Sequence, residues 1–162
     1  MIEFFFSFFT DKMSSKRILF EITEASKNTI DGICLIPNEN DTTIWKGYIT
    51  GPQGTPYYGY ILTVDIKIPP NYPLNPPNIK FHHFVFHPNV SANGEICLDI
   101  LKTQWTPTLT LGSVLLSLCS LLNDPNPDSA LNGEAGRYWK TDRKKYDEKV
   151  KEFCEKHCQK IA

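Results

Sequence analysis

Cys97 is the side chain whose surroundings point most directly to covalent chemistry. It follows a His-Pro-Asn tripeptide (residues 87–89) and an Asn-Gly pair (residues 93–94) in the stretch FHPNVSANGEICLDIL. Proline restricts the backbone and Asn-Gly readily adopts positive φ, so we expect a fixed, largely irregular loop. A thiol held on such a loop has a set direction. As a thiolate it is a nucleophile that can carry an acyl group as a thioester.

The composition is that of one globular domain. The 162 residues are 41% hydrophobic and 22% charged, with a formal net charge of −1. The chain lacks the surplus of basic residues that would suggest nucleic-acid binding. It also lacks the block of like charges that would suggest a disordered tail. Five cysteines at irregular spacing do not form the pattern of a disulfide framework. We therefore expect a reducing compartment, in which a thiol stays free.

An apolar, Phe-rich run opens the chain at residues 1–9. It is shorter than the roughly 20 residues that span a bilayer, and it lacks the basic start and cleavage site of a secretory signal. We predict that residues 1–12 are a leader outside the fold and that residues 13–162 form the domain. No membrane association is expected, with a weak surface anchor as the alternative.

The elements before the loop predict a helix and a sheet. One apolar stripe predicts a helix over residues 14–26, capped by Ser14 or Ser15. The proline-rich residues 69–77 predict a stiff loop in which one bond could be cis. Alternation and turn residues predict an antiparallel meander of four strands, at residues 33–36, 43–50, 60–68 and 79–82.

The elements after the loop are predicted helices. An apolar helix is expected over residues 110–122 with Thr110 as its cap, and residues 123–128 end it. A helix over residues 129–139 and a last one from about Asp142 follow. Helices segregated from strands in this order are typical of an α+β fold.

The motifs of this chain, taken together, resemble those of the ubiquitin-conjugating enzymes. The resemblance extends from about Lys16 to the last helix. Residues 140–146 are most similar to the broad-specificity members that cooperate with RING ligases and have a minimal catalytic domain. The matching motifs are Trp45, Gly51-Pro52-x-Gly54-Thr55-Pro56-Tyr57, Tyr72-Pro73-x-x-Pro76-Pro77, His87-Pro88-Asn89, Ile96-Cys97-Leu98-Asp99, Trp105-x-Pro107 and Asp124-Pro125-Asn126-Pro127.

This resemblance implies an acyltransferase with a thioester intermediate. Cys97 would accept ubiquitin from an activating enzyme. It would pass ubiquitin to a substrate lysine with a RING-type ligase, or to the cysteine of a HECT-type ligase. ATP is consumed upstream by the activating enzyme, so no bound cofactor and no metal are expected. The implied protein is a monomer of the cytoplasm and the nucleus.

The resemblance also implies roles for the residues around Cys97. Asn89 either stabilises the tetrahedral oxyanion, where one donor is typically worth roughly 3–4 kcal/mol, or orders the loop. His87 is expected to hold the loop, because an adjacent base would activate water against the thioester. The other supporting residues are Pro88, Asp99, Asp128, Ser129 and Leu131.

Ser129 is a departure from the most similar members, which have a second aspartate at this place. An acidic residue there helps the incoming lysine to lose its proton. Asp99 or Asp128 could compensate, and a phosphate on Ser129 could restore the charge. Our preferred minimum role for Ser129 is to cap the following helix.

Partner surfaces are implied in the same way. Leu116 and Ser120 match the face that holds the donor ubiquitin, and core packing is the alternative for Leu116. Contacts with the ligase and the activating enzyme are implied for Lys16, Arg17, Leu74, Thr106 and Pro107. Close relatives have lysines where this chain has Phe20 and Asn75. They have a serine where it has Cys34, near the sheet surface that in relatives binds a second ubiquitin.

Three other functions stay open at this point. The cargo could be another ubiquitin-like modifier, the fold could be a non-catalytic ubiquitin-binding variant, or Cys97 and His87 could form a cysteine hydrolase. Cys97 in its full motif argues against the non-catalytic variant. Cys154, His157 and Cys158 have the spacing of a partial metal site, but a fourth ligand is missing and we favour helix packing.

Overall fold

The centre of the computed structural model is an antiparallel sheet. The structure describes residues 2–27 and 29–161, with side chains from Ser14 onward in the first helix. The sheet has the order β1-β2-β3-β4, which confirms the predicted meander and the α+β class. All four predicted strands are confirmed to within about one residue at each end, as β1 (Ile33–Pro37), β2 (Ile44–Thr50), β3 (Tyr60–Lys67) and β4 (Asn78–Phe81).

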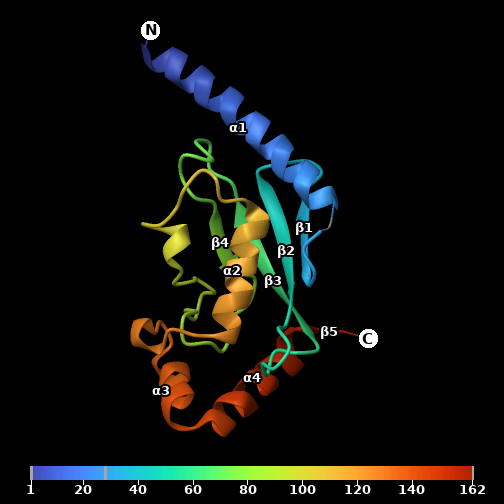
Figure 1. Ribbon diagram of the computed structural model, residues 1–162, viewed down its shortest axis with the longest axis vertical. Coiled ribbons are helices and arrows are strands. Elements are labelled where there is room, and N and C mark those ends of the chain that lie inside the picture. Colours follow the sequence, from blue (N-terminus) through green and yellow to red (C-terminus); the bar gives the residue numbers. More distant parts are fainter. Residues whose placement is uncertain (1, 28, 162) are drawn as a thin grey trace.

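Helix α2 (Leu111–Asn123) covers one face of this sheet, as Figure 1 shows. Alternate residues of β3 are buried, as a strand with one covered face requires. Gly47 on β2 allows the helix to approach, because a Cβ there would lie 2.6 Å from Val64 Cγ2 and 2.8 Å from Leu115 Cδ2. The core of the domain therefore lies between α2 and the sheet.

The N-terminus of α2 confirms Thr110 as the cap. The Ser113 N–H donates to Thr110 Oγ1 at 3.1 Å, and the Thr110 N–H donates to Ser113 Oγ at 2.9 Å. This reciprocal capping box satisfies two backbone donors that the helix itself leaves unpaired. It fixes where α2 begins and hence which of its sides faces the sheet.

Helix α1 (Ile2–Lys27) corrects the predicted start of the first helix. We expected it to begin at Ser14 or Ser15, but helical backbone continues through both. The reason is that residues 2–13 contain neither glycine nor proline to end a helix. The boundary predicted at Met13 lies inside α1 and stays a prediction. The side chains of the Phe-rich run lie outside the described residues.

A buried carboxylate joins α1 to the rest of the fold. Glu21 is only 2% exposed and accepts hydrogen bonds from Tyr72 Oη at 2.6 Å and from the Leu111 N–H at 3.1 Å. It also accepts from Arg17 Nε at 2.9 Å. The Arg17 guanidinium donates in addition to the carbonyls of Leu109 and Pro107, at 2.5 and 2.6 Å. This network fixes α1, the proline-rich loop and the start of α2 against one another.

The C-terminal helices differ from prediction at one boundary. A short 3-10 helix, η2 (Pro127–Ser129), precedes α3 (Gly133–Thr141). The cap of α3 is Asn132, whose Oδ1 accepts from the Ala135 N–H at 3.1 Å, so the predicted capping role of Ser129 is wrong. The physical reason is that Asn126 Oδ1 accepts from the Asp128 N–H and closes the 3-10 turn first.

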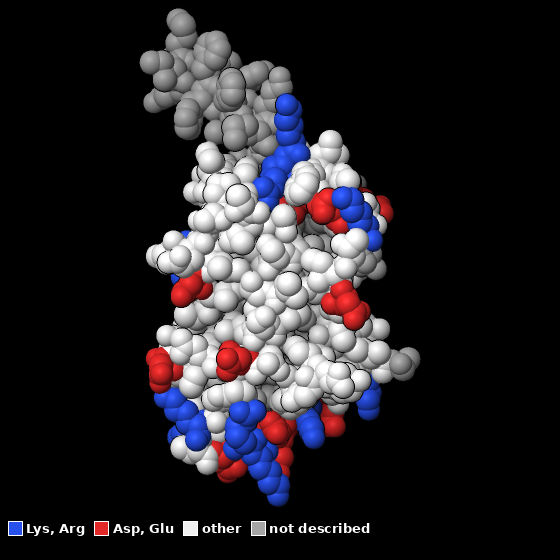
Figure 2. Space-filling model, in the orientation of Figure 1, with Lys and Arg blue, Asp and Glu red and all other residues white. Residues whose placement is uncertain are grey.

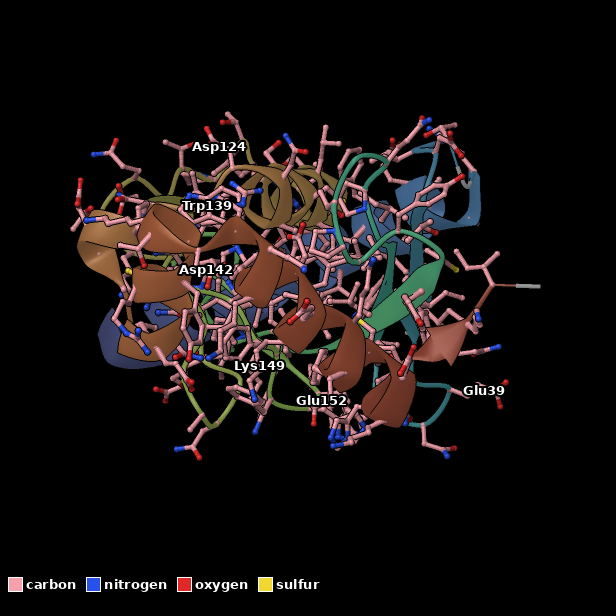
Figure 3. The ribbon with its side chains drawn as sticks, turned by 90° about the horizontal axis from the view of Figure 1, so that it is seen from below. Glu39, Asp124, Trp139, Asp142, Lys149 and Glu152 are labelled. Atoms are coloured by element: carbon pink, nitrogen blue, oxygen red, sulfur yellow. The ribbon has the colours of Figure 1, made fainter. Side chains whose placement is uncertain are left out.

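Helix α4 (Arg143–His157) begins as predicted, with Asp142 Oδ1 accepting from the Lys145 N–H at 3.0 Å. Figure 3 shows Asp142 beside the start of α4, with Lys149 and Glu152 further along the helix. After α4, the unpredicted strand β5 (Gln159–Lys160) pairs with the start of β3. Two residues are too few to show an alternating pattern.

The described residues contain neither a membrane-spanning helix nor a metal-binding cluster. None of the helices in residues 2–27 and 29–161 has the length and hydropathy to cross a bilayer. Within the same part of the chain, no three His, Cys, Asp or Glu side chains are grouped to bind a metal ion. Cys154 is buried and His157 is exposed, so these two side chains of α4 do not face the same environment.

Candidate active site

The segment between β4 and the 3-10 helix η1 (Asp99–Leu101) is an irregular loop, as predicted. Its tip turns at Gly94, which has a φ of 81°, and the Phe81 N–H donates to the Gly94 carbonyl at 2.9 Å. A Cβ at this position would lie 2.3 Å from the Phe81 carbonyl oxygen. The predicted Asn-Gly turn is confirmed, and it packs directly against the end of β4.

Each residue of the His-Pro-Asn tripeptide is anchored to a different segment of backbone. The His87 ring bonds the Leu121 carbonyl, near the end of α2, through Nε2 at 2.9 Å. The Pro88 carbonyl accepts from the N–H groups of Leu131 and Asn132, at 2.8 and 3.0 Å. The loop is thereby fixed to both ends of the connection between α2 and α3.

Asn89 uses its whole side-chain amide in these contacts. Its Nδ2 donates to the carbonyls of Asn126 and Ser129, at 2.7 and 3.2 Å, and its Oδ1 accepts from the Asn126 N–H at 2.8 Å. The side chain is 1% exposed, and the Asn89 carbonyl accepts from the Cys97 N–H at 2.9 Å. Of the two roles considered, this geometry supports ordering of the loop, because both amide hydrogens already have acceptors.

His87 is a neutral ring that holds the loop. It is fully buried, and burial lowers its pKa from 6.5 to about 4. Its Nδ1 accepts from the Asn89 N–H at 3.0 Å, so Nε2 carries the proton donated to Leu121. No hydrogen bond among the described residues joins His87 to Cys97. The arrangement therefore gives no support to a Cys-His pair.

The buried neutral His87 predicts a loss of stability in mild acid. The unfolded chain takes up a proton near pH 6.5, whereas the folded chain does so only near pH 4. The stabilisation is therefore complete above pH 6.5 and is lost as the pH falls toward 4. Between pH 7 and pH 5 we expect the free energy of unfolding to fall by about 2 kcal/mol from this group alone. Urea unfolding at the two pH values measures the change.

The matched control for this prediction is His87→Asn, which keeps a side-chain acceptor but cannot titrate. It should be less stable than the wild type at pH 7 and should lack most of the loss between pH 7 and pH 5. The other three histidines are exposed and remain in both proteins. An equal loss in the variant would show that His87 does not cause the pH dependence.

Cys97 is partly exposed at the end of this anchored loop. Lys102 lies beside it, with Nζ 4.0 Å from Sγ. Asp99 is exposed in the first turn of η1. Asp128 is exposed on η2 and accepts from Lys140 Nζ at 2.6 Å, and this hydrogen bond lowers the pKa of the Asp128 carboxyl.

The remaining predicted site residues fall into two groups. Ser129 and Leu131 are exposed and are brought next to the loop through the bonds of their backbones to Asn89 and Pro88. Leu116 is 51% exposed, so core packing is wrong for it, and Ser120 is exposed on the same helix. In Figure 2 the middle of the face on which α2 lies is largely free of charged side chains, which gather near α1 at one end and near α3 and α4 at the other.

The residues predicted to contact a ligase or activating enzyme lie mainly on exposed loops. Leu74 is 50% exposed, and Lys16, Thr106 and Pro107 are also exposed. Trp105 Nε1 donates to the Pro73 carbonyl at 2.8 Å, which holds the two loops together. Arg17 is different, because its guanidinium is engaged within the chain. Cys34 is exposed on β1.

Two of the contacts described above were not found from the sequence, namely those of Glu21 and of Lys102. The sequence next to Glu21 does not indicate its role, because its three hydrogen-bond donors come from Arg17 on α1, from residue 72 and from residue 111. Lys102 follows Cys97 by five positions, and only the fold of η1 shows that its amine reaches the thiol.

The chain was compared with models of protein families. The model described as "Ubiquitin-conjugating enzyme" matches residues 17–154. The matched region begins within α1, ends within α4, and contains the whole loop that carries Asn89 and Cys97.

Proposed function

Because the chain belongs to the ubiquitin-conjugating enzyme family, we propose that Cys97 accepts ubiquitin as a thioester from an activating enzyme. Ubiquitin then passes to a substrate lysine with a RING-type ligase, or to the cysteine of a HECT-type ligase. The observation that carries this proposal is the partly exposed Cys97 thiol at the end of a loop that the buried Asn89 and His87 anchor.

The proposed chemistry is two acyl transfers. In the first, the Cys97 thiolate attacks the thioester carbonyl on the activating enzyme, a new C–S bond forms, and the thiolate of the activating enzyme leaves. In the second, an unprotonated lysine amine attacks the new thioester. A C–N bond forms, the C–S bond breaks, and the Cys97 thiolate is released. The amine proton passes to water or to a carboxylate.

The loop contributes to this chemistry by holding Cys97 in a fixed position. Asn89 and His87 hold the backbone that carries Cys97, so the acyl carbon stays in one place when the amine arrives. Asp99, Asp128, Ser129 and Leu131 are proposed to line the path of the incoming lysine. The exposed carboxylates of Asp99 and Asp128 would attract its ammonium group.

Partner binding is proposed on two exposed surfaces. The uncharged outer side of α2, with Leu116 and Ser120, would hold the donor ubiquitin. Lys16, Leu74, Thr106 and Pro107 would contact the activating enzyme and the ligase. Arg17 would act on the same surface indirectly, because it donates to the carbonyls of Pro107 and Leu109.

The test of this function is a loading assay. The protein is mixed with ubiquitin-activating enzyme, ATP and ubiquitin, and the products are separated on a non-reducing gel. We expect a band shifted by the mass of ubiquitin, which a thiol reductant removes and which free lysine discharges. No band under conditions that load another member of the family would contradict the proposal. If the protein is loaded only with a different ubiquitin-like modifier, by the activating enzyme of that modifier, then ubiquitin is not its cargo.

A further inference from the structure

Two of the free cysteines lie one helical turn apart at the end of α4. Cys154 is buried in the core, and Cys158 is partly buried against the same core. The Cys158 N–H donates to the Cys154 carbonyl at 2.9 Å, so the two residues follow one another along one side of the helix. Both thiols lie within electrostatic range of Tyr57 and Tyr60. The two sulfurs are therefore directed toward the same part of the core.

The two thiols also contact each other. The Cys154 S–H donates to the Cys158 sulfur, and this hydrogen bond, together with burial, raises the pKa of the Cys154 thiol. The same hydrogen bond lowers the pKa of the Cys158 thiol. The partly exposed member of the pair is thus the more readily ionised one, and the thiolate is the form that reacts with oxidants. A reactive cysteine beside a second thiol is the arrangement of a redox-active pair.

We propose that Cys154 and Cys158 form a reversible oxidation site, at which a peroxide converts the two thiols into a disulfide within one chain. The Cys158 thiolate attacks one oxygen of hydrogen peroxide. An S–O bond forms, the O–O bond breaks, and the hydroxide that leaves takes up a proton to become water. Cys154 then attacks the sulfur of this sulfenic acid. An S–S bond forms, the S–O bond breaks, and a second water leaves with the Cys154 proton. The pair is oxidised by two electrons, and the peroxide is reduced.

The end of α4 favours a disulfide that both forms and opens readily. Cα atoms four residues apart in a helix are separated by about 6.2 Å, within the range of roughly 4.4–6.8 Å found across disulfides. Their Cβ atoms are about 5–6 Å apart, whereas a disulfide needs about 3.5–4.5 Å, so the last turn must shift. Cys158 is the C-cap, with φ −107° and ψ 147°, so it already leaves the helix there. A strained disulfide has a raised reduction potential, and thiol reductants open it easily.

The other three cysteines do not form such a pair. Cys34 lies on β1, Cys97 on the irregular loop and Cys119 on α2. Among the described residues, no hydrogen bond joins any of these three to another cysteine. Burial also raises the pKa of the Cys119 thiol to about 11, which keeps it protonated and unreactive. We therefore expect peroxide to form one disulfide within the chain, at the end of α4.

The experiment treats the full chain with a small molar excess of hydrogen peroxide, removes the peroxide and blocks the remaining thiols with N-ethylmaleimide. Trypsin cleaves after Lys156, between the two cysteines, so the disulfide would link the peptides of residues 152–156 and 157–160. We expect mass spectrometry to detect this linked pair, and dithiothreitol to separate it. The protein should remain a monomer on a non-reducing gel, and Cys119 should still be blocked as a free thiol.

Cys158→Ser and Cys154→Ser should each abolish the linked peptides. In Cys154→Ser the oxidation of Cys158 should continue to the sulfinic acid, because no second thiol traps the sulfenic acid. Thermal unfolding checks that both variants fold, and Cys158→Ser is the milder change because this side chain is only partly buried.

The matched control is Cys34→Ala, which removes an exposed cysteine outside the pair and should form the linked peptides like the wild type. Absence of the linked peptides from oxidised wild-type protein would overturn the inference. Their appearance only in a disulfide-linked dimer, or a disulfide between Cys158 and a cysteine other than Cys154, would overturn it as well. Loading of Cys97 with ubiquitin is a separate measurement, so the proposed function does not depend on this result.

Discussion

The Cys97→Ala variant is expected to form no ubiquitin thioester at all, while it folds like the wild type. The side chain is partly exposed at a loop end, so removal of its sulfur opens no cavity in the core. Loading is read on a non-reducing gel, and folding by thermal unfolding. Cys97→Ser should give a slower-forming adduct that resists thiol reductant, because a hydroxyl is a weaker nucleophile and forms an oxyester.

The matched control for Cys97 is Cys34→Ala. Cys34 is also a free and exposed cysteine, but it lies on β1, away from the anchored loop. This variant should load ubiquitin like the wild type. A thioester that survives in Cys97→Ala, or that is lost in Cys34→Ala, would place the acyl group on a different sulfur and would contradict the proposed function.

The Asn89→Ala variant is expected to lose both stability and transfer. Its amide makes three hydrogen bonds to the backbone of residues 126 and 129, and their partners would be left unsatisfied. A loss of about 2–4 kcal/mol in the free energy of unfolding follows, measured by urea unfolding. Discharge of the thioester to free lysine should slow by roughly a hundredfold, because small displacements of reacting groups have effects of this size.

The matched control for Asn89 is Asn93→Ala, the same change at an exposed asparagine of the same loop. It should change neither the unfolding free energy nor the discharge rate appreciably. The two readouts together separate the roles of Asn89. Slow discharge of Asn89→Ala with wild-type stability would contradict loop ordering and would favour direct donation to the oxyanion.

Local sequence patterns predicted the sheet and most helix ends. Alternation gave the four strands. The cap Thr110 and the helix start near Asp142 were predicted because each cap accepts from an N–H group only three residues further along the chain. The prediction at Ser129 failed because two candidate caps compete within a few residues. Asn126 closes a turn first, and Asn132 then caps α3.

The site was predictable only where its residues are close in sequence or belong to a familiar motif. Cys97 and Asn89 were predicted in this way, whereas the contacts that hold the Asn89 side chain reach residues 126 and 129. Glu21 gathers donors from residues 17, 72 and 111, a grouping that only the tertiary fold creates. The geometry of η1 likewise decides that Lys102 faces the sulfur.

The anchors of the His-Pro-Asn tripeptide are main-chain groups, which every amino acid supplies except that proline lacks the N–H. His87, Pro88 and Asn89 bond the main chain at residues 121, 126, 129, 131 and 132, and none of these bonds uses a side chain of the receiving residue. The side chains of Leu121, Ser129 and Leu131 can therefore be replaced without loss of these anchors, as long as the main-chain groups remain. At residue 129 the bond from Asn89 uses only the carbonyl, so the side chain there can vary while the loop around the sulfur stays anchored.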